Sequence, residues 1–225
     1  MQKWLLVLII IGLIPIVLFG RGWLVQSKAE LILLSDAEQL QLLQFARSHL
    51  GDVLAGKSGI VVNIDSLSVN LKRQAACFLT LTKDGALRGC IIDDFRPHEP
   101  LYKNVLRNVV LAATADQRFS PVRVDELDKI KIEISVLDIP RLLAFDDPEE
   151  LPKRLNPGKD GVILTTAAGT STYLPHVWEQ FPDPVEFLSS LCEKQGACTD
   201  CWQTSPLPRV EIYHVFHFAE GDISL

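Results

Sequence analysis

Residues able to do chemistry gather in the run from Arg88 to Cys90, which follows an apolar segment and a Lys-Asp-Gly turn. Arg88 carries a permanent planar cation that can bind a carboxylate or a phosphate. Gly89 lets another group approach the backbone closely. Cys90 is a candidate catalytic nucleophile, because an adjacent arginine favours the thiolate form of a cysteine. The alternative is a buried structural cysteine beside a surface arginine.

Two further polar positions lie on one predicted strand. Glu133 and Ser135 alternate with isoleucine and valine between residues 130 and 136, which is the period of a β-strand. They therefore share the face opposite the apolar residues. That face is either exposed to solvent or lines a cleft.

A second group of cysteines occurs near the C-terminus. Cys198 and Cys201 form a C-x-x-C pair, and Cys192 precedes them. Such a pair can bind a metal or form a disulfide. A closed zinc site needs four ligands, however, and no second pair follows. We therefore expect a local Cys198–Cys201 disulfide or reduced loop thiols, with no metal site and no cofactor.

The remaining chain mixes helices and strands without strict alternation. A capping box at Ser35 predicts a first helix that ends near Gly51. We also predict helices over 100–115, 175–180 and 183–194, and strands over 77–82, 87–91, 130–136, 161–166 and 210–218. This order predicts an α+β fold with a mixed or antiparallel sheet flanked by helices.

The N-terminus has a different character. Residues 4–19 are apolar or small and carry no charge, and apolar residues continue to Val25 beyond Arg21. This length predicts a single-pass transmembrane helix over residues 1–25, with a cleaved signal peptide as the alternative. A linker over 26–34 and one folded domain over 35–225 would follow. Lysine and arginine on the two flanks do not decide the membrane topology.

Charge limits the choice of partners. The net charge of −6 and the pI of about 5.4 disfavour non-specific nucleic-acid binding, because contacts to phosphates need a basic surface. No run of lysines and arginines provides a local exception.

Residues 87–91 resemble the Leu-Arg-Gly-Cys-Ile-Gly signature of the AMMECR domain, the A component of the AmmeMemoRadiSam set. Segments 116–122, 131–137, 158–164, 173–178 and 187–194 also resemble this family, in the family's order. The resemblance extends from about Ser35 to the C-terminus. Two positions depart from the pattern. Ile92 replaces a glycine, and His176 replaces the usual glutamine.

The resemblance implies a larger lobe and a smaller one, and the family's usual setting favours the cytoplasmic side of the membrane. It brings Arg118 and Phe119 near the signature, so that Arg88 and Arg118 would flank one anion site. Alternatively, Arg118 caps the carbonyl end of the preceding helix. The resemblance also favours a cleft beside Glu133 and Ser135.

His176 could act as a base for Cys90. A Cys–His pair cannot be the mechanism shared by the family, however, because the family usually has glutamine at that position.

The activity expected from the resemblance is a small-molecule or protein-modification role, exercised at the membrane with Memo-like and radical-SAM-like partners. The chain contains no three-cysteine iron–sulfur motif, so it is not itself the radical-SAM component. The rival interpretation is a non-catalytic interaction module that recruits partners to a membrane. A concave pocket that contains Cys90 and Arg88 would favour the enzyme.

Overall fold

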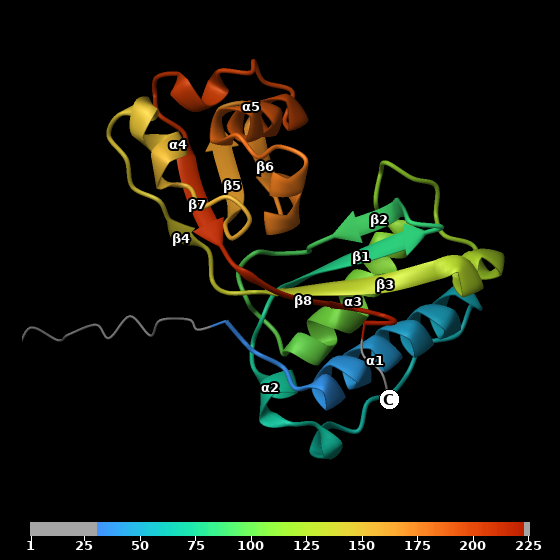
Figure 1. Ribbon diagram of the computed structural model, residues 1–225. Coiled ribbons are helices and arrows are strands. Elements are labelled where there is room, and N and C mark those ends of the chain that lie inside the picture. The colour runs from blue at the N-terminus through green and yellow to red at the C-terminus, as the bar shows by residue number, and fades with distance from the viewer. Residues whose placement is uncertain (1–30, 223–225) are drawn as a thin grey trace, which may run out of the picture.

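Two antiparallel sheets divide the chain into two lobes (Figure 1). The computed structural model describes residues 31–222. The larger lobe holds the sheet β2-β1-β3-β8, and the smaller lobe holds the sheet β4-β7-β5-β6. The predicted α+β class and its division into a larger and a smaller lobe are therefore confirmed.

The larger lobe places its helices on one face of the sheet (Figure 1). Its strands are β1 (Cys77–Lys83), β2 (Ala86–Ile91), β3 (Ile130–Leu137) and β8 (Val215–Ala219), and its helices are α1 (Asp36–Leu54), α2 (Val69–Lys72) and α3 (Leu101–Thr114). Ile132 and Ile134 of β3 are fully buried in the core that α1 and α3 cover. The opposite face of this sheet is turned toward the smaller lobe (Figure 1).

Helix α1 begins as predicted and ends later than predicted. The Ser35 side chain accepts from the Glu38 N–H, and the Glu38 carboxylate accepts from the Ser35 N–H. The helix passes through Gly51 and ends at Leu54. A glycine inside a helix costs only about 1 kcal/mol, which the packing of Leu50 in the core offsets. Ile32, inside the predicted linker, is also buried in the core.

The smaller lobe packs around an aromatic pair. Its strands are β4 (Arg141–Leu142), β5 (Gly161–Thr166), β6 (Gly169–Tyr173) and β7 (Arg209–Tyr213), and its helices are α4 (Leu151–Arg154) and α5 (Pro184–Lys194). Trp178 stacks on Phe187 with ring centroids 3.7 Å apart. Short 3₁₀ turns complete the described chain: η1 (Ile64–Ser66), η2 (Val124–Lys129), η3 (Pro148–Glu150), η4 (Pro175–Glu179) and η5 (Cys201–Gln203).

The segment 210–218 forms strands as predicted, but it is divided into β7 and β8, which belong to different sheets, so the prediction of one closing strand is wrong. The chain crosses between the lobes at His214, beside its other crossing at Asp138. The Asp138 carboxylate accepts from the His214 N–H at 2.7 Å, and the Asp138 N–H donates to the His214 carbonyl at 3.1 Å. These bonds hold the two crossings side by side. β7 and β8 therefore separate into different sheets at His214, although the alternating pattern of the sequence runs through this residue without a break.

The predicted Cys198–Cys201 pairing is also wrong. The disulfide joins Cys192 to Cys201, and Cys198 is an exposed free cysteine. Cys192 lies on the buried face of α5, where it meets Cys201 in the core of the smaller lobe.

Among residues 31–222, no helix is both long and apolar enough to cross a bilayer. The predicted membrane segment, residues 1–25, and most of the predicted linker lie outside the described residues.

Candidate functional site

A β-bulge in β2 separates the side chains of the signature. Leu81 of β1 pairs with Gly89, and the next residue, Thr82, pairs with Leu87. Arg88 is therefore the extra residue on β2. Such an extra residue interrupts the regular alternation of side chains between the two faces of the sheet. Leu87 and Cys90 both line a cavity between the lobes, whereas Arg88 lines a different hollow. The expectation that Arg88 and Cys90 share one cleft is wrong for this reason.

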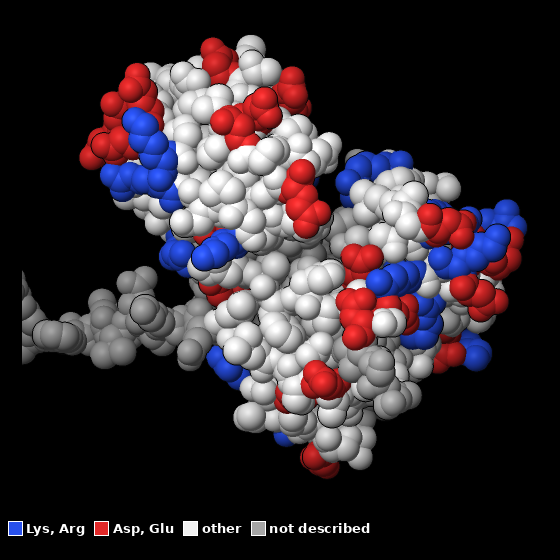
Figure 2. Space-filling model, in the orientation of Figure 1, with Lys and Arg blue, Asp and Glu red and all other residues white. Residues whose placement is uncertain are grey.

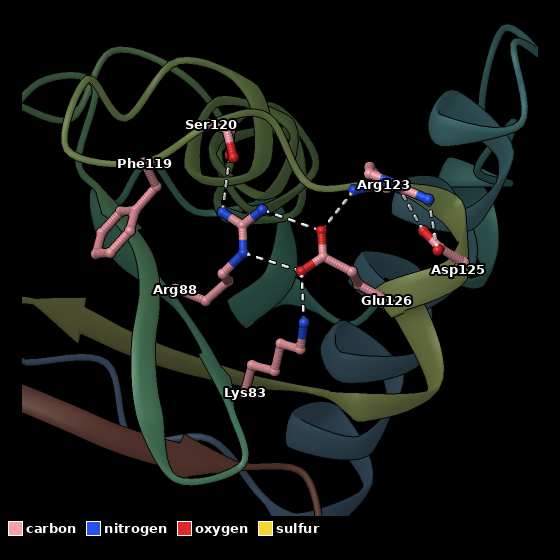
Figure 3. Close-up of a pocket in the computed structure, with 7 residues that line it drawn as sticks. All are labelled: Lys83, Arg88, Phe119, Ser120, Arg123, Asp125 and Glu126. Atoms are coloured by element: carbon pink, nitrogen blue, oxygen red, sulfur yellow. Dashed lines mark hydrogen bonds and ion pairs between the residues drawn. The ribbon is translucent and has the colours of Figure 1, made fainter.

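Figure 3 shows the Arg88 hollow, a space of about 420 Å³ lined by Lys83, Arg88, Phe119, Ser120, Arg123, Asp125 and Glu126. The Arg88 guanidinium donates to both carboxylate oxygens of Glu126, at 3.2 and 3.0 Å. It also donates to the backbone carbonyls of Ser120, at 2.8 Å, and Pro121, at 3.3 Å.

Each charged side chain in this hollow has an ion-pair partner. The Lys83 ammonium donates to Glu126 at 2.8 Å. Hydrogen bonds from Arg88 and Lys83 lower the pKa of Glu126 to about 2. Arg88 therefore fastens the loop after α3 to the β1–β2 hairpin, and its donors are occupied by the protein itself.

Gly89 fits closely against α3. A Cβ atom at this position would lie 2.1 Å from the carbonyl oxygen of Ala112. The close approach that the sequence suggested at Gly89 is therefore made by a helix of the protein.

The inter-lobe cavity brings three of the predicted residues together. It has a volume of about 510 Å³. The larger lobe contributes Cys90 and Arg118, and the smaller lobe contributes His176 and Lys194. Apolar side chains, among them Phe78, Leu87, Leu174 and Val177, form much of the remaining wall.

Asp116 positions the larger-lobe side of this cavity. Its carboxylate, with only 5% of its side chain exposed, accepts from the Cys90 N–H at 2.9 Å. It also accepts from Arg118 through the backbone N–H, at 3.1 Å, and through Nε and Nη2, at 2.9 and 2.7 Å. Hydrogen bonds from Arg118 lower the pKa of Asp116 to about 2. Asp116 thus fixes both the Cys90 backbone and the Arg118 guanidinium.

Arg118 serves neither predicted role. It pairs with Asp116 and donates weakly to the Cys90 carbonyl, at 3.4 Å, so it does not cap the carbonyl end of α3. It also lies in a different hollow from Arg88. Phe119 lines the Arg88 hollow, and the Arg118 guanidinium carbon lies 5.5 Å from its ring centroid.

The Cys90 thiol is not a ready thiolate. Burial raises its pKa, and the charges of Arg118 and Lys194 offset this only in part. The Thr80 hydroxyl donates to Cys90 Sγ at 3.2 Å. The predicted lowering of the Cys90 pKa by Arg88 is wrong, because the bulge turns the guanidinium away.

His176 presents a neutral imidazole to the cavity at neutral pH. Burial lowers its pKa, and the charge of His217 lowers it further, while Glu133 acts in the opposite direction. A neutral imidazole can accept a proton or a hydrogen bond.

Glu133 and Ser135 pair with Thr80 and Phe78 of β1, which line the inter-lobe cavity, so they lie on the sheet face turned toward the smaller lobe. Glu133 accepts from the Thr82 hydroxyl at 3.3 Å, and the buried Ser135 hydroxyl lies 3.1 Å from His217 Nδ1. Their position therefore fits the cleft interpretation better than full solvent exposure. Neither residue is among those that line the inter-lobe cavity.

The sequence analysis missed Lys194 and Asp116. Lys194 lies in the last turn of α5, where a lysine is ordinarily explained by the helix dipole and by solvent. Its Nζ donates to the Thr172 carbonyl at 2.8 Å and lies 4.5 Å from the Tyr173 ring centroid. For Asp116, the available signal was its place in the segment that resembles the family.

Comparisons with known proteins agree with this architecture. The family model described as AMMECR1 matches residues 43–218. A protein of Methanothermobacter thermautotrophicus is 33% identical over 189 residues, which cover 82% of this chain and 96% of the relative. Protein NEQ441 of Nanoarchaeum equitans is 34% identical over 176 residues, which cover 77% of this chain and 94% of the relative.

A solved structure has the same fold. The crystal structure of the uncharacterized protein PH0010 from Pyrococcus horikoshii matches with a TM-score of 0.76 at 30% identity. The match covers 84% of this chain and 94% of that chain. By fold and by sequence along most of its length, this chain belongs to the AMMECR1 family.

Proposed function

We propose that the inter-lobe cavity binds a small molecule, or a side chain of another protein, for chemical modification. The observation that supports this proposal is the convergence of Cys90, Arg118, His176 and Lys194 from two lobes on one cavity of about 510 Å³. A concave site with apolar walls and a few convergent polar groups is the usual form of a ligand site.

The chemistry of the cavity favours proton transfer and binding over a resting nucleophile. A neutral His176 can accept a proton, and a protonated Cys90 thiol can donate one. Covalent attack by Cys90 would require a base to remove its proton first, and His176 is the base that the cavity offers.

Partners would supply the chemistry that these residues lack. We include Memo-like and radical-SAM-like proteins in the proposal, on the basis of the AmmeMemoRadiSam set that the sequence resembles. The apolar N-terminal segment would hold the domain at a membrane as a single-pass anchor.

The rival is a non-catalytic interaction module that recruits partners to the membrane. The raised pKa of Cys90 favours this rival, because it removes the most reactive group from the resting cavity. The two functions differ in their requirement for an open cavity: a modifying domain needs it, and a recruiting surface elsewhere on the protein does not.

The test is a thermal-shift screen of small organic acids, amines and amides against the full-length protein. Compounds that raise the melting temperature of the parent protein should not raise that of Leu87→Trp. Leu87 lines the cavity and is 42% exposed, so a larger side chain there obstructs the opening. Leu142→Trp, at an exposed leucine on β4 outside the cavity, is the matched control. The interaction module would be favoured if no compound raised the melting temperature, or if compounds raised it equally in the parent protein and in Leu87→Trp.

A further inference from the structure

Lys194 brings a positive charge to the inter-lobe cavity without a carboxylate partner among the described residues. An ammonium has three N–H donors. The Thr172 carbonyl accepts from Nζ at 2.8 Å, and the Tyr173 ring lies 4.5 Å away. Neither neighbour is a carboxylate, so no ion pair among the described residues compensates the charge of Lys194.

Arg118 brings a second positive charge to the same cavity from the opposite lobe. Its Nε and Nη2 donate to Asp116, while Nη1 has no hydrogen-bond partner in the part of the chain that the structure describes. Burial lowers the pKa of Lys194, and the charge of Arg118 lowers it further. Among the residues that line the cavity, Asp116 is the one carboxylate, against these two cations.

The surroundings of the two cations are mainly apolar. Phe78, Leu174 and Val177 line the cavity beside them. His176 adds no positive charge at neutral pH because its pKa is lowered. Figure 2 shows the notch between the lobes, with lysine and arginine side chains on the neighbouring rim of the larger lobe and acidic side chains on the rim of the smaller lobe. The residues that line the cavity thus offer a ligand two cations, one carboxylate and mainly apolar walls.

We propose that the inter-lobe cavity takes an organic anion, a carboxylate or a phosphate on an apolar body, held between Lys194 Nζ and Arg118 Nη1. This inference rests on the proposed function, because it requires the cavity to be a ligand site. The anion supplies the negative charge that Asp116 alone does not provide. An organic cation would add a third positive charge, and a neutral amide would leave Lys194 uncompensated.

The experiment is a ¹⁹F NMR titration of full-length protein in a mild detergent, with detergent alone as the blank. The probes are 4-fluorobenzoate, 4-fluorophenyl phosphate and the neutral 4-fluorobenzamide. At least one anion should bind about tenfold more tightly than the amide, because a hydrogen bond to a charged group is worth more than a neutral one. The anion that binds more tightly identifies the ligand as a carboxylate or a phosphate.

Two glutamine variants isolate the charge. Lys194→Gln keeps an amide donor for the Thr172 carbonyl and should weaken anion binding by about tenfold, a larger loss than that of amide binding. Lys194→Arg should restore most of the anion affinity. Lys159→Gln removes an exposed lysine elsewhere in the smaller lobe and should have no effect. Matching melting temperatures show that each variant is folded.

The outcomes separate this inference from the proposed function. If the amide binds as well as the anions, or if Lys194→Gln binds them normally, the anion site is refuted. In that case a loss of amide binding in Leu87→Trp still supports a ligand cavity. If no anion binds, the anion site is refuted as well, and the wider thermal-shift screen decides whether the cavity binds other ligands.

Discussion

Replacing Gly89 with alanine tests how closely β2 must lie against α3. The new Cβ would lie 2.1 Å from the Ala112 carbonyl oxygen. An ordinary carbon–oxygen contact is about 3.3 Å, so strand and helix would have to separate by about 1 Å. The atom in the way belongs to the backbone, so a side-chain rotation cannot relieve the clash.

Overpacking of this kind costs about 1–3 kcal/mol of unfolding free energy, and a backbone clash belongs in the upper half of that range. In a chain of this length, each 1 kcal/mol changes the melting temperature by about 2–4 °C. We therefore expect Gly89→Ala to melt about 4–12 °C below the parent protein. Ligand binding should weaken as well, because Cys90 and the Asp116 contact move with β2.

The matched control is Gly51→Ala. Gly51 lies inside α1, and a Cβ there would meet no atom within 4 Å. Alanine is favoured over glycine in a helix by about 1 kcal/mol, so this variant should melt about 2–4 °C higher than the parent. Differential scanning calorimetry measures both changes. A Gly89→Ala protein that melts at the same temperature as the parent would refute the close contact.

Three further predictions concern ionisation and thiols. The pKa of Asp116 is lowered from 3.8 to about 2, so it contributes about 2 kcal/mol of unfolding free energy above pH 3.8, and this contribution is lost as the pH falls toward 2. In Asp116→Asn the unfolding free energy should therefore change less with pH over this interval. An unchanged pH dependence in that variant would contradict this account. Iodoacetamide at pH 7 should alkylate Cys90 more slowly than the exposed Cys198, because burial raises the pKa of Cys90; faster labelling of Cys90 would indicate a poised thiolate. Peptide mapping without reductant should find Cys192 joined to Cys201; a bridge that includes Cys198 would refute that pairing.

Local signals in the sequence predicted much of the larger lobe. The capping box at Ser35 and the alternation along β3 depend on neighbours within one turn or one strand, and both features are present as predicted. The end of α1 was misplaced because Gly51 is a plausible stop signal. Whether a helix stops there depends on packing against residues distant in the sequence.

Non-local geometry explains the remaining errors. The break between β7 and β8 depends on Asp138, which is far from His214 in the sequence. The bulge at Arg88 appears only in the pairing of β2 with β1, so the sequence alone suggested that Arg88 and Cys90 act together. Lys194 reaches the cavity only because the smaller lobe folds over the outer sheet face. The sequence analysis nevertheless identified Cys90, Arg118 and His176, which the two lobes do bring to one cavity.

The most direct test of the central proposal is amide NMR of isotope-labelled protein, saturated with the tightest-binding compound from the thermal-shift screen. If the inter-lobe cavity is the ligand site, the largest shift changes will fall on both lobes, around Cys90 in β2 and around Lys194 in α5. Changes confined to one lobe, or centred on Arg88 and Glu126, would contradict it.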